Sequence, residues 1–290
     1  MKRLFIISFF SVAACPFLLY AAPFDQSPDM PPATSVEKSS SSFAAEGSTK
    51  PIAPILLTKV PNSAFKIGEK LIFSLKYEFI TAGTATMEVS EGPMVDDRPT
   101  ISIQSRAESN GFVDSFFKVR DFNSSIVDRD ALVSWNFHQN LKEGGYNVIR
   151  NTLIDYKSHI YTFHRIRKAS NTERSGSIDR PVFDILSAFF YARTLPLKLG
   201  KRFEITVFSD EDIYQLGIKV SPKLEKVHVA AGRFECFRLE PAILGDGIFN
   251  AKEGKMVLWV TDDERKMPVL LRSKVFIGAV DAELASFTPK

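Results

Sequence analysis

The sequence has little of what catalytic and metal sites are usually built from. It contains two cysteines and four histidines in 290 residues, and no histidine has a partner at metal-ligand spacing. No Gly-x-Ser-x-Gly turn and no phosphate-cradling glycine-rich loop is present. We therefore expect no catalytic residue, no metal and no cofactor, and a chain that is not an enzyme.

An excess of charge of one sign is also missing. Lysine and arginine total 37 and aspartate and glutamate total 34, which leaves a formal net charge of +3. Nucleic-acid-binding domains usually cluster lysine and arginine on a more basic surface, so no nucleic-acid partner is expected. What the chain does have is phenylalanine, at 25 residues. These side chains either fill a core or line an apolar cavity for a lipid-like ligand.

The N-terminal residues have the order of a secretory signal. Lys2 and Arg3 precede an apolar run over residues 4–19, and the small residues Ala21 and Ala22 follow. This order predicts a signal peptide over residues 1–22. The predicted location is the periplasm or the outer-membrane periphery of a Gram-negative-type bacterium.

Two alternatives to simple cleavage stay open. Val12-Ala13-Ala14-Cys15 has the form of a lipoprotein box, in which the signal would end at residue 14 and Cys15 would be lipidated. The apolar run also approaches the length that spans a bilayer, so an uncleaved anchor is the third alternative. Membrane association is therefore expected only through the N-terminus, and only if it is uncleaved or lipidated.

Composition divides the remaining chain into a linker and one domain. Residues 23–54 are rich in serine, proline and alanine, and four consecutive serines stand at 39–42. Such a segment buries too little apolar surface to offset its chain entropy, so we predict a disordered linker. Residues 55–290 contain no second linker and are predicted to form a single β-rich domain.

Short alternating segments recur through this domain, with turn signals between them. Alternation is typical of half-buried strands, and strands so close in sequence leave no room for helical crossovers, so the sheet should be antiparallel. The predicted class is all-β, as a curved sheet or barrel-like sandwich with one short helix. Gly83 is predicted to interrupt a strand. The predicted strands lie within residues 65–77, 84–89, 100–105, 122–127, 132–140, 146–155, 159–165, 202–209, 213–220, 225–230, 234–241, 255–261 and 269–277.

The helix is predicted near residues 181–193, where the spacing changes. Phe183, Leu186 and Phe190 fall on one face at steps of three and four residues. Asp179 is the predicted N-cap, and Pro181 suits the first turn. We expect this helix to plug one side or end of the curved sheet.

Two charged segments allow both a functional and a structural interpretation. Arg165, Arg167 and Lys168 form a short predicted loop that either contacts an anionic envelope surface or is a solvated face. Residues 262–264 carry three consecutive acidic side chains, which could ligate calcium. Their spacing matches no calcium loop, so a hairpin turn is the preferred interpretation.

Three single residues also allow both a functional and a structural interpretation. Asp184 and Arg193 either act in a site or complement the dipole of the predicted helix, and the dipole interpretation is preferred. Cys236 lies in an alternating segment and is interpreted as a small buried hydrophobe rather than a reactive thiol. If Cys15 is removed or lipidated, Cys236 is alone and no internal disulfide can form.

Three segments in a fixed order resemble a known family. The first is Phe65-x-x-Gly68-Glu69-x-Leu71, with Gly83 closing the same stretch. The second covers residues 183–193, and the third covers residues 259–269 and is followed by Gly278. Together they resemble the bacterial family called domain of unknown function 3108, over roughly residues 60–287. The resemblance implies an exported, β-rich envelope protein without an assigned activity, and it brings no catalytic residues.

Three classes of function are compatible with the sequence, in this order of preference. A non-enzymatic curved sheet could bind a hydrophobic or lipid-like envelope component, with Phe183, Leu186, Phe190 and Trp259 as candidate cavity or lid residues. A structural module could bind a protein partner of the envelope through an exposed apolar patch. An enzyme with an unrecognised site would show a cleft of side chains with perturbed pKa values.

The mature N-terminus distinguishes the signal alternatives. Soluble cleavage predicts a mass that begins after residue 22, whereas lipidation predicts a diacylated or triacylated Cys15 at the N-terminus. Cys15→Ser should release the protein from the membrane only if Cys15 is lipidated. Intact mass of the protein from envelope fractions checks both expectations, and an unprocessed mass would contradict cleavage and lipidation together.

Overall fold

The computed structural model describes residues 53–168, 170–209, 212–244, 256–274 and 278–288. The predicted signal segment with Cys15 lies outside the described residues. The predicted linker also lies outside them, apart from residues 53 and 54.

The described residues form one continuous antiparallel sheet in the order β8-β7-β6-β5-β4-β3-β2-β1-β15-β14-β13-β12-β10-β9, with β11 paired to β12. The predicted fold class is therefore confirmed. The first half comprises β1 (Lys70–Tyr77), β2 (Ile80–Glu91), β3 (Thr100–Ser109), β4 (Arg120–Asp128), β5 (Ser134–Glu143), β6 (Tyr146–Asp155), β7 (Ile160–Arg167) and β8 (Ser170–Ser177). The second half comprises β9 (Arg202–Ser209), β10 (Asp212–Val220), β11 (Glu225–Val229), β12 (Gly232–Leu244), β13 (Met256–Thr261), β14 (Pro268–Lys274) and β15 (Ala279–Phe287).

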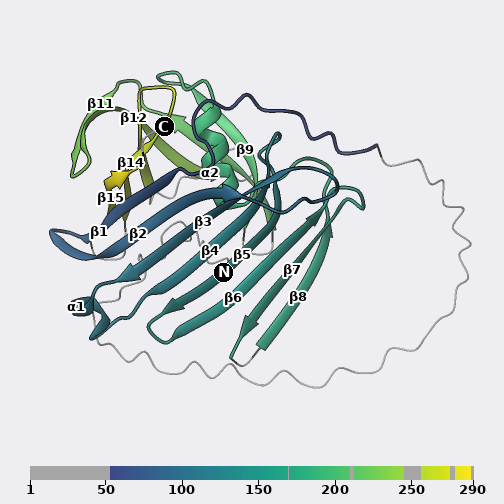
Figure 1. Ribbon diagram of the computed structural model, residues 1–290, viewed down its shortest axis with the longest axis horizontal. Coiled ribbons are helices and arrows are strands. Elements are labelled where there is room, and N and C mark those ends of the chain that lie inside the picture. The colour runs from purple at the N-terminus through teal and green to yellow at the C-terminus, as the bar shows by residue number, and fades with distance from the viewer. Residues whose placement is uncertain (1–52, 169, 210–211, 245–255, 275–277, 289–290) are drawn as a thin grey trace, which may run out of the picture.

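Pairing of the first strand with the last joins the two halves. β1 runs antiparallel to β15 from Leu71 opposite Phe287 to Tyr77 opposite Val280. β8 and β9 end the described sheet and are not paired with each other, so it curves without closing into a barrel. Figure 1 shows the two halves bending around the helix α2 (Ile185–Thr194). We call the face toward α2 the concave face and the opposite face the convex face.

The helix begins at Asp184 rather than at the predicted cap. The Asp184 carboxylate accepts the N–H groups of Leu186 at 2.7 Å and Ser187 at 3.0 Å, and it also accepts the Ser125 hydroxyl of β4. Asp179 instead pairs with Arg180 on the surface. The residues between them are extended, because Phe183 exchanges backbone hydrogen bonds with β9. The helix therefore spans 185–194 instead of 181–193.

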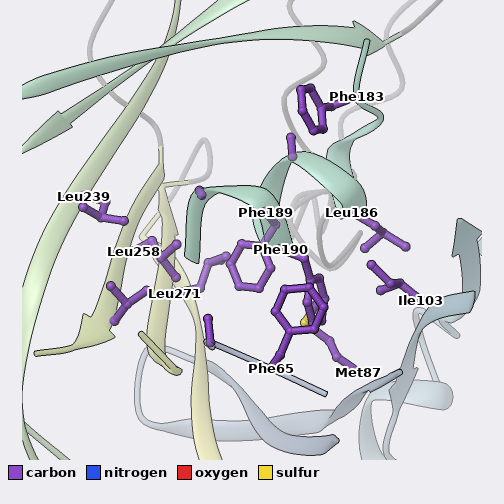
Figure 2. Packing of buried hydrophobic residues seen from close by; sticks show 14 of the residues in the cluster. Phe65, Met87, Ile103, Phe183, Leu186, Phe189, Phe190, Leu239, Leu258 and Leu271 are labelled. Carbon is purple, nitrogen blue, oxygen red and sulfur yellow. The ribbon is translucent and has the colours of Figure 1, made fainter. Parts of the chain in front are cut away.

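Seven of the ten residues of α2 are buried, so the helix packs on more than one side. Phe190 packs beside Phe65 and Met87, and Leu186 lies toward Ile103 of β3 (Figure 2). Phe189 faces the strands of the second half. The predicted helix therefore does plug the curved sheet, and it packs against both halves at once.

A buried ion pair fixes the C-terminal end of α2. The Arg193 guanidinium is 1% exposed and binds the Glu69 carboxylate through two contacts of 2.6 and 2.9 Å. It also donates to the carbonyl oxygens of Ala64 and Arg265, and it lies over the rings of Phe65 and Phe190. Arg193 thus does more than complement the helix dipole, because it ties α2 to the segment before β1 and to the turn before β14.

Two segments that were predicted to separate or interrupt strands are themselves part of strands. β7 and β8 pair along their whole lengths, so Arg165 and Arg167 lie on a strand and only Lys168 lies in the turn. β8 gives no alternating signal because it is an edge strand with mostly exposed side chains. Gly83 lies inside β2, where an added Cβ would come 2.1 Å from the carbonyl oxygen of Glu108, so the glycine permits close approach to β3.

The acidic residues at 262–264 form the preferred hairpin turn. Asp263 accepts hydrogen bonds from the Thr261 hydroxyl at 2.6 Å and from the Arg265 backbone N–H at 3.0 Å. Burial disfavours its charge, but these bonds and the Arg265 guanidinium outweigh burial and lower its pKa. Asp263 therefore stabilises the turn that connects β13 and β14.

Replacing the buried guanidinium should be costly. We expect Arg193→Ala to lower the free energy of unfolding by about 3–5 kcal/mol, because Glu69 would be left as a buried charge without its partner. Urea denaturation of the mature protein measures this loss. Arg180→Ala is the matched control, since its pair with Asp179 is exposed and its loss should leave the free energy of unfolding nearly unchanged. A loss at Arg193 below about 1 kcal/mol would contradict the anchoring role.

Candidate functional site

Three of the predicted cavity residues lie together on or beside α2. Leu186 is fully buried and Phe190 is 1% exposed, with its ring centroid 4.8 Å from that of Phe65. Phe183 precedes the helix and stacks on Tyr191 at 4.5 Å. These side chains are packed into the core between α2 and the sheet rather than around open space.

Trp259 lies apart from them, on the other face of β13. Its indole N–H donates to Glu225 of β11 at 2.8 Å, and the Arg238 guanidinium lies 5.8 Å from its ring. Its neighbour Leu258 faces α2, and adjacent residues of a strand point to opposite faces. The structure therefore does not bring Trp259 into a common site with the helix residues.

A small apolar cavity, which we call the α2 cavity, lies between α2 and the second half of the sheet. Its volume is about 60 Å³. Ala188 and Ala192 leave the space on the helix side, and Leu239, Leu258 and Leu271 close it on the sheet side. The spacing of Phe183, Leu186 and Phe190 predicted one apolar face of the helix, and Phe189 and Ala192 provide the second contact face.

A larger apolar cavity lies on the concave face, among the ends of β1, β2, β3 and β15. Its volume is about 280 Å³, and a short helix, α1 (Gly111–Asp114), covers it together with the residues that follow. We call it the α1 cavity. The pattern of residues 110–119 predicted neither a strand nor a helix, although three phenylalanines stand close together there. The lining residues are Leu75, Tyr77, Ile80, Ala82, Ser109, Phe112, Val113, Phe116, Phe117, Val119 and Val280.

Polar contacts hold the cover of the α1 cavity in place. The Asn110 side chain accepts the Val113 N–H at 3.0 Å and donates to the Thr81 carbonyl oxygen at 2.7 Å. Asp114 pairs with Arg120, and this guanidinium together with the Ser109 hydroxyl lowers the pKa of the Asp114 carboxyl. The cover is thereby attached to both β2 and β4.

The mouth of the α1 cavity exposes several apolar side chains. Phe112 is 66% exposed and Phe116 is 47% exposed, although both line the cavity. Their rings meet edge to face at 5.5 Å. Phe79, in the turn between β1 and β2, is 91% exposed and precedes the lining residue Ile80. An apolar rim next to an apolar cavity allows a hydrocarbon ligand to enter from outside.

Beyond the α1 cavity, the concave face becomes polar. Asn123 of β4 donates to the Ser105 hydroxyl of β3 at 3.2 Å, and Gln139 of β5 donates to the Asn123 carbonyl oxygen at 3.1 Å. These buried side chains stand opposite one another in the strand register. The concave face therefore offers hydrogen-bonding groups beside an apolar cavity.

The described residues show no group of three histidine, cysteine, aspartate or glutamate side chains placed to hold a metal ion. The His164 Nδ1 atom lies 3.6 Å from a carboxylate oxygen of Glu173 on the convex face. No helix in the described ranges is long and apolar enough to cross a membrane.

Cys236 is fully buried on β12. Burial raises the pKa of its thiol to about 12, and the nearby carboxylates Asp263, Asp262 and Glu225 add to the shift. The thiolate is therefore scarce at neutral pH, in agreement with the interpretation of Cys236 as a buried hydrophobe.

The curved antiparallel sheet, its helix plug and its apolar cavity define a half-barrel class of protein with an open concave face. The family model described as "Protein of unknown function (DUF3108)" matches residues 72–285, and the chain belongs to this family. The resemblance inferred from the three sequence segments is thus confirmed.

Two solved structures are similar to this chain at 10% sequence identity. One is a β-barrel-like protein of domain of unknown function 1849 from Brucella abortus, with a TM-score of 0.49 over 78% of this chain and 98% of that chain. The other is a candidate exported protein with a YmcC-like fold from Bacteroides fragilis, with a TM-score of 0.28 over 80% of this chain and 99% of that chain. No curated protein matches the chain.

The state of Cys236 can be checked by alkylation. At pH 8 we expect iodoacetamide to modify Cys236 at least about a hundredfold more slowly in the native protein than in urea, because unfolding restores an ordinary thiol pKa and exposes the sulfur. Mass spectrometry follows the added carbamidomethyl group. Equal rates in the two states would mean that the thiol is accessible and reactive in the fold.

Proposed function

We propose that this chain is an exported, non-enzymatic protein that binds the apolar part of a lipid-like envelope component on the concave face of its sheet. The observation that carries the proposal is the α1 cavity, with a volume of about 280 Å³ and an almost entirely apolar lining. Ligand pockets usually measure about 300–1,000 Å³ and combine an apolar lining with a few polar groups. The α1 cavity is close to the lower end of that range.

The position of α2 supports the choice of this cavity. The helix fills one part of the concave space with Leu186, Phe189 and Phe190 and leaves the α2 cavity at only about 60 Å³. In this proposal α2 is a fixed plug rather than a lid, since the Arg193–Glu69 pair anchors it. The ligand would enter past the exposed phenylalanines of the α1 cavity.

Export supports the envelope as the source of the ligand. The signal pattern of residues 1–22 supports a working domain outside the cytoplasm, where the lipids of the envelope are available as apolar ligands. The absence of recognised catalytic motifs in the sequence favours binding over catalysis.

A second candidate function is protein-partner binding through the convex face. Ile149 of β6 and Ile166 of β7 stand directly opposite each other, and both are exposed. Leu153 and Ile160 extend the exposed apolar side chains of this face. Such exposed apolar side chains favour a contact surface.

Truncating the cavity mouth tests the binding proposal. We expect Phe112→Ala/Phe116→Ala to weaken binding of a fluorescent alkyl probe by about tenfold or more, since two large apolar contacts are removed. Both side chains are exposed, so the melting temperature should change little. Probe titration of the mature protein measures affinity, and native mass spectrometry of protein purified gently from the envelope shows whether a lipid is already bound.

Ile149→Ala/Ile166→Ala on the convex face is the matched control and should leave probe affinity unchanged. Val119→Phe provides a second variant, because it fills the α1 cavity from the sheet side. If the cavity variants and the convex control all bind the probe as the wild type does, the α1 cavity is not the binding site.

A further inference from the structure

Three exposed phenylalanines stand at one edge of the sheet, in two separate connections. Phe79 lies in the turn between β1 and β2, and Phe112 and Phe116 lie in the connection between β3 and β4. Asn110 joins the two connections, because its side chain donates to the Thr81 carbonyl oxygen at 2.7 Å. Figure 1 shows α1 and the turn between β1 and β2 at the same edge. We call the three phenylalanines the phenylalanine rim.

The rim presents its rings to the outside on a fixed backbone. Phe79 is the most exposed large apolar side chain of the described residues, at 91%. The rings of Phe112 and Phe116 meet each other edge to face, so they form one apolar surface. The polar contacts of Asn110 and Asp114 hold this surface to β2 and β4. Contiguous exposed apolar side chains of this kind mark sites that contact a protein or a membrane.

The shape of the rim suits a flat target. Its side chains come from the connections at the ends of neighbouring strands, and such strands lie about 5 Å apart. Connections at one edge of a sheet can therefore meet a plane at the same time. A lipid bilayer offers such a plane, and phenylalanine is one of the side chains that enter the boundary between its head groups and its acyl chains.

Exposed lysines accompany the rim. Lys118 lies in the same connection as Phe116, and Lys274 ends β14 opposite Ala279. The carboxylate of Glu78, which precedes Phe79, accepts the backbone N–H of Ala279 at 3.1 Å. Lys274 therefore lies beside the turn between β1 and β2. Ammonium groups next to inserted apolar side chains suit the head groups of anionic lipids.

The carboxylates near this edge do not form an acidic surface around the rim. Asp114 pairs with Arg120, and Glu78 accepts a backbone hydrogen bond. Glu108 of β3 is the Cα partner of Arg120 and points to the convex face, because its neighbour Ser109 lines the α1 cavity on the concave face. The charge beside the rim is thus compatible with an anionic membrane.

The rim also borders the α1 cavity. Phe112 and Phe116 line this cavity, and Ile80, which follows Phe79, lines it as well. A hydrocarbon chain that left a bilayer at this mouth would stay in contact with apolar side chains. It would thereby avoid the cost of exposing each of its methylene groups to water. A cavity with its mouth on the membrane can take up such a chain directly.

We propose that the phenylalanine rim inserts into the surface of a lipid bilayer, with Lys118 and Lys274 on the head groups of anionic lipids, and docks the mouth of the α1 cavity on the membrane. The uptake of a ligand from the membrane rests on the proposed function, whereas the docking itself does not. The contact belongs to the folded domain, so it is separate from any attachment through the N-terminus.

Co-sedimentation with vesicles tests the docking, with protein purified without residues 1–22. The vesicles contain either phosphatidylcholine alone or equal parts of phosphatidylcholine and phosphatidylglycerol. We expect Phe79→Ala to weaken binding to both by at least about fivefold, because an inserted ring is lost. Lys118→Gln/Lys274→Gln should weaken binding to the anionic vesicles by about tenfold and leave binding to phosphatidylcholine unchanged.

Two controls lie at the opposite edge of the sheet. Met94 is 64% exposed in the connection between β2 and β3, and Lys66 is exposed before the start of β1. Met94→Ala and Lys66→Gln should bind both kinds of vesicle as the wild type does. Phe79→Trp reports on insertion, and its emission should shift to the blue on vesicles. The native Trp135 and Trp259 are buried, so they contribute a constant background.

Affinity for a soluble alkyl probe separates docking from ligand binding. Phe79 is not among the residues that line the α1 cavity, so Phe79→Ala should bind the soluble probe as the wild type does. The same variant should take up a fluorescent lipid from vesicles more slowly than the wild type. Val119→Phe, which fills the cavity, should lose the probe and still bind vesicles.

The outcomes distinguish the two proposals. Equal vesicle binding by the wild type and Phe79→Ala, or an unshifted Phe79→Trp spectrum, overturns the docking. Failure of the wild type to bind either kind of vesicle also overturns it and leaves the rim as a contact for a protein. If the wild type docks through the rim but binds no alkyl probe, the proposed function fails and the docking stands.

Discussion

The buried contact between Arg193 and Glu69 is the interaction on which the rest of the structure depends. A long antiparallel sheet with one apolar face must curve around something that covers that face. Here α2 provides the cover, and Arg193 attaches its end to the segment before β1 and to the turn between β13 and β14. Because β1 and β15 join the two halves, this attachment holds the helix where the halves meet.

The position of the plug decides where a ligand can bind. α2 packs against both halves with large side chains, and its two alanines leave only a small space toward the second half. The concave face therefore has room at the end that α1 covers, where the lining is apolar and the mouth carries exposed phenylalanines. Toward β4 and β5 the same face turns polar, with Asn123 and Gln139 hydrogen-bonded across the strands.

Much of the fold follows from local patterns in the sequence. The alternation of apolar and polar residues predicted most strands, because one face of each strand is buried. The short segments between consecutive strands required antiparallel pairing. Two strand assignments failed for identifiable reasons. The edge strand β8 has mostly exposed side chains, so its sequence does not alternate between apolar and polar residues. Gly83 does not interrupt β2, because the glycine lets the β2 backbone lie close to Glu108 of β3. The cap was misplaced because Asp179 and Asp184 are both plausible in sequence, and only the pairing of Phe183 with β9 shows which one starts the helix.

The sequence by itself determined the family, the antiparallel class, the presence of one apolar helix and the low reactivity expected of Cys236. These depend on composition, on periodicity and on motifs that lie close together along the chain. Tertiary structure alone decided that Trp259 lies apart from the helix residues, that residues 110–119 cover a cavity, and that Asn123 stands between Ser105 and Gln139. Each of these depends on strand register, and a shift of one residue would move every side chain of a strand to the opposite face.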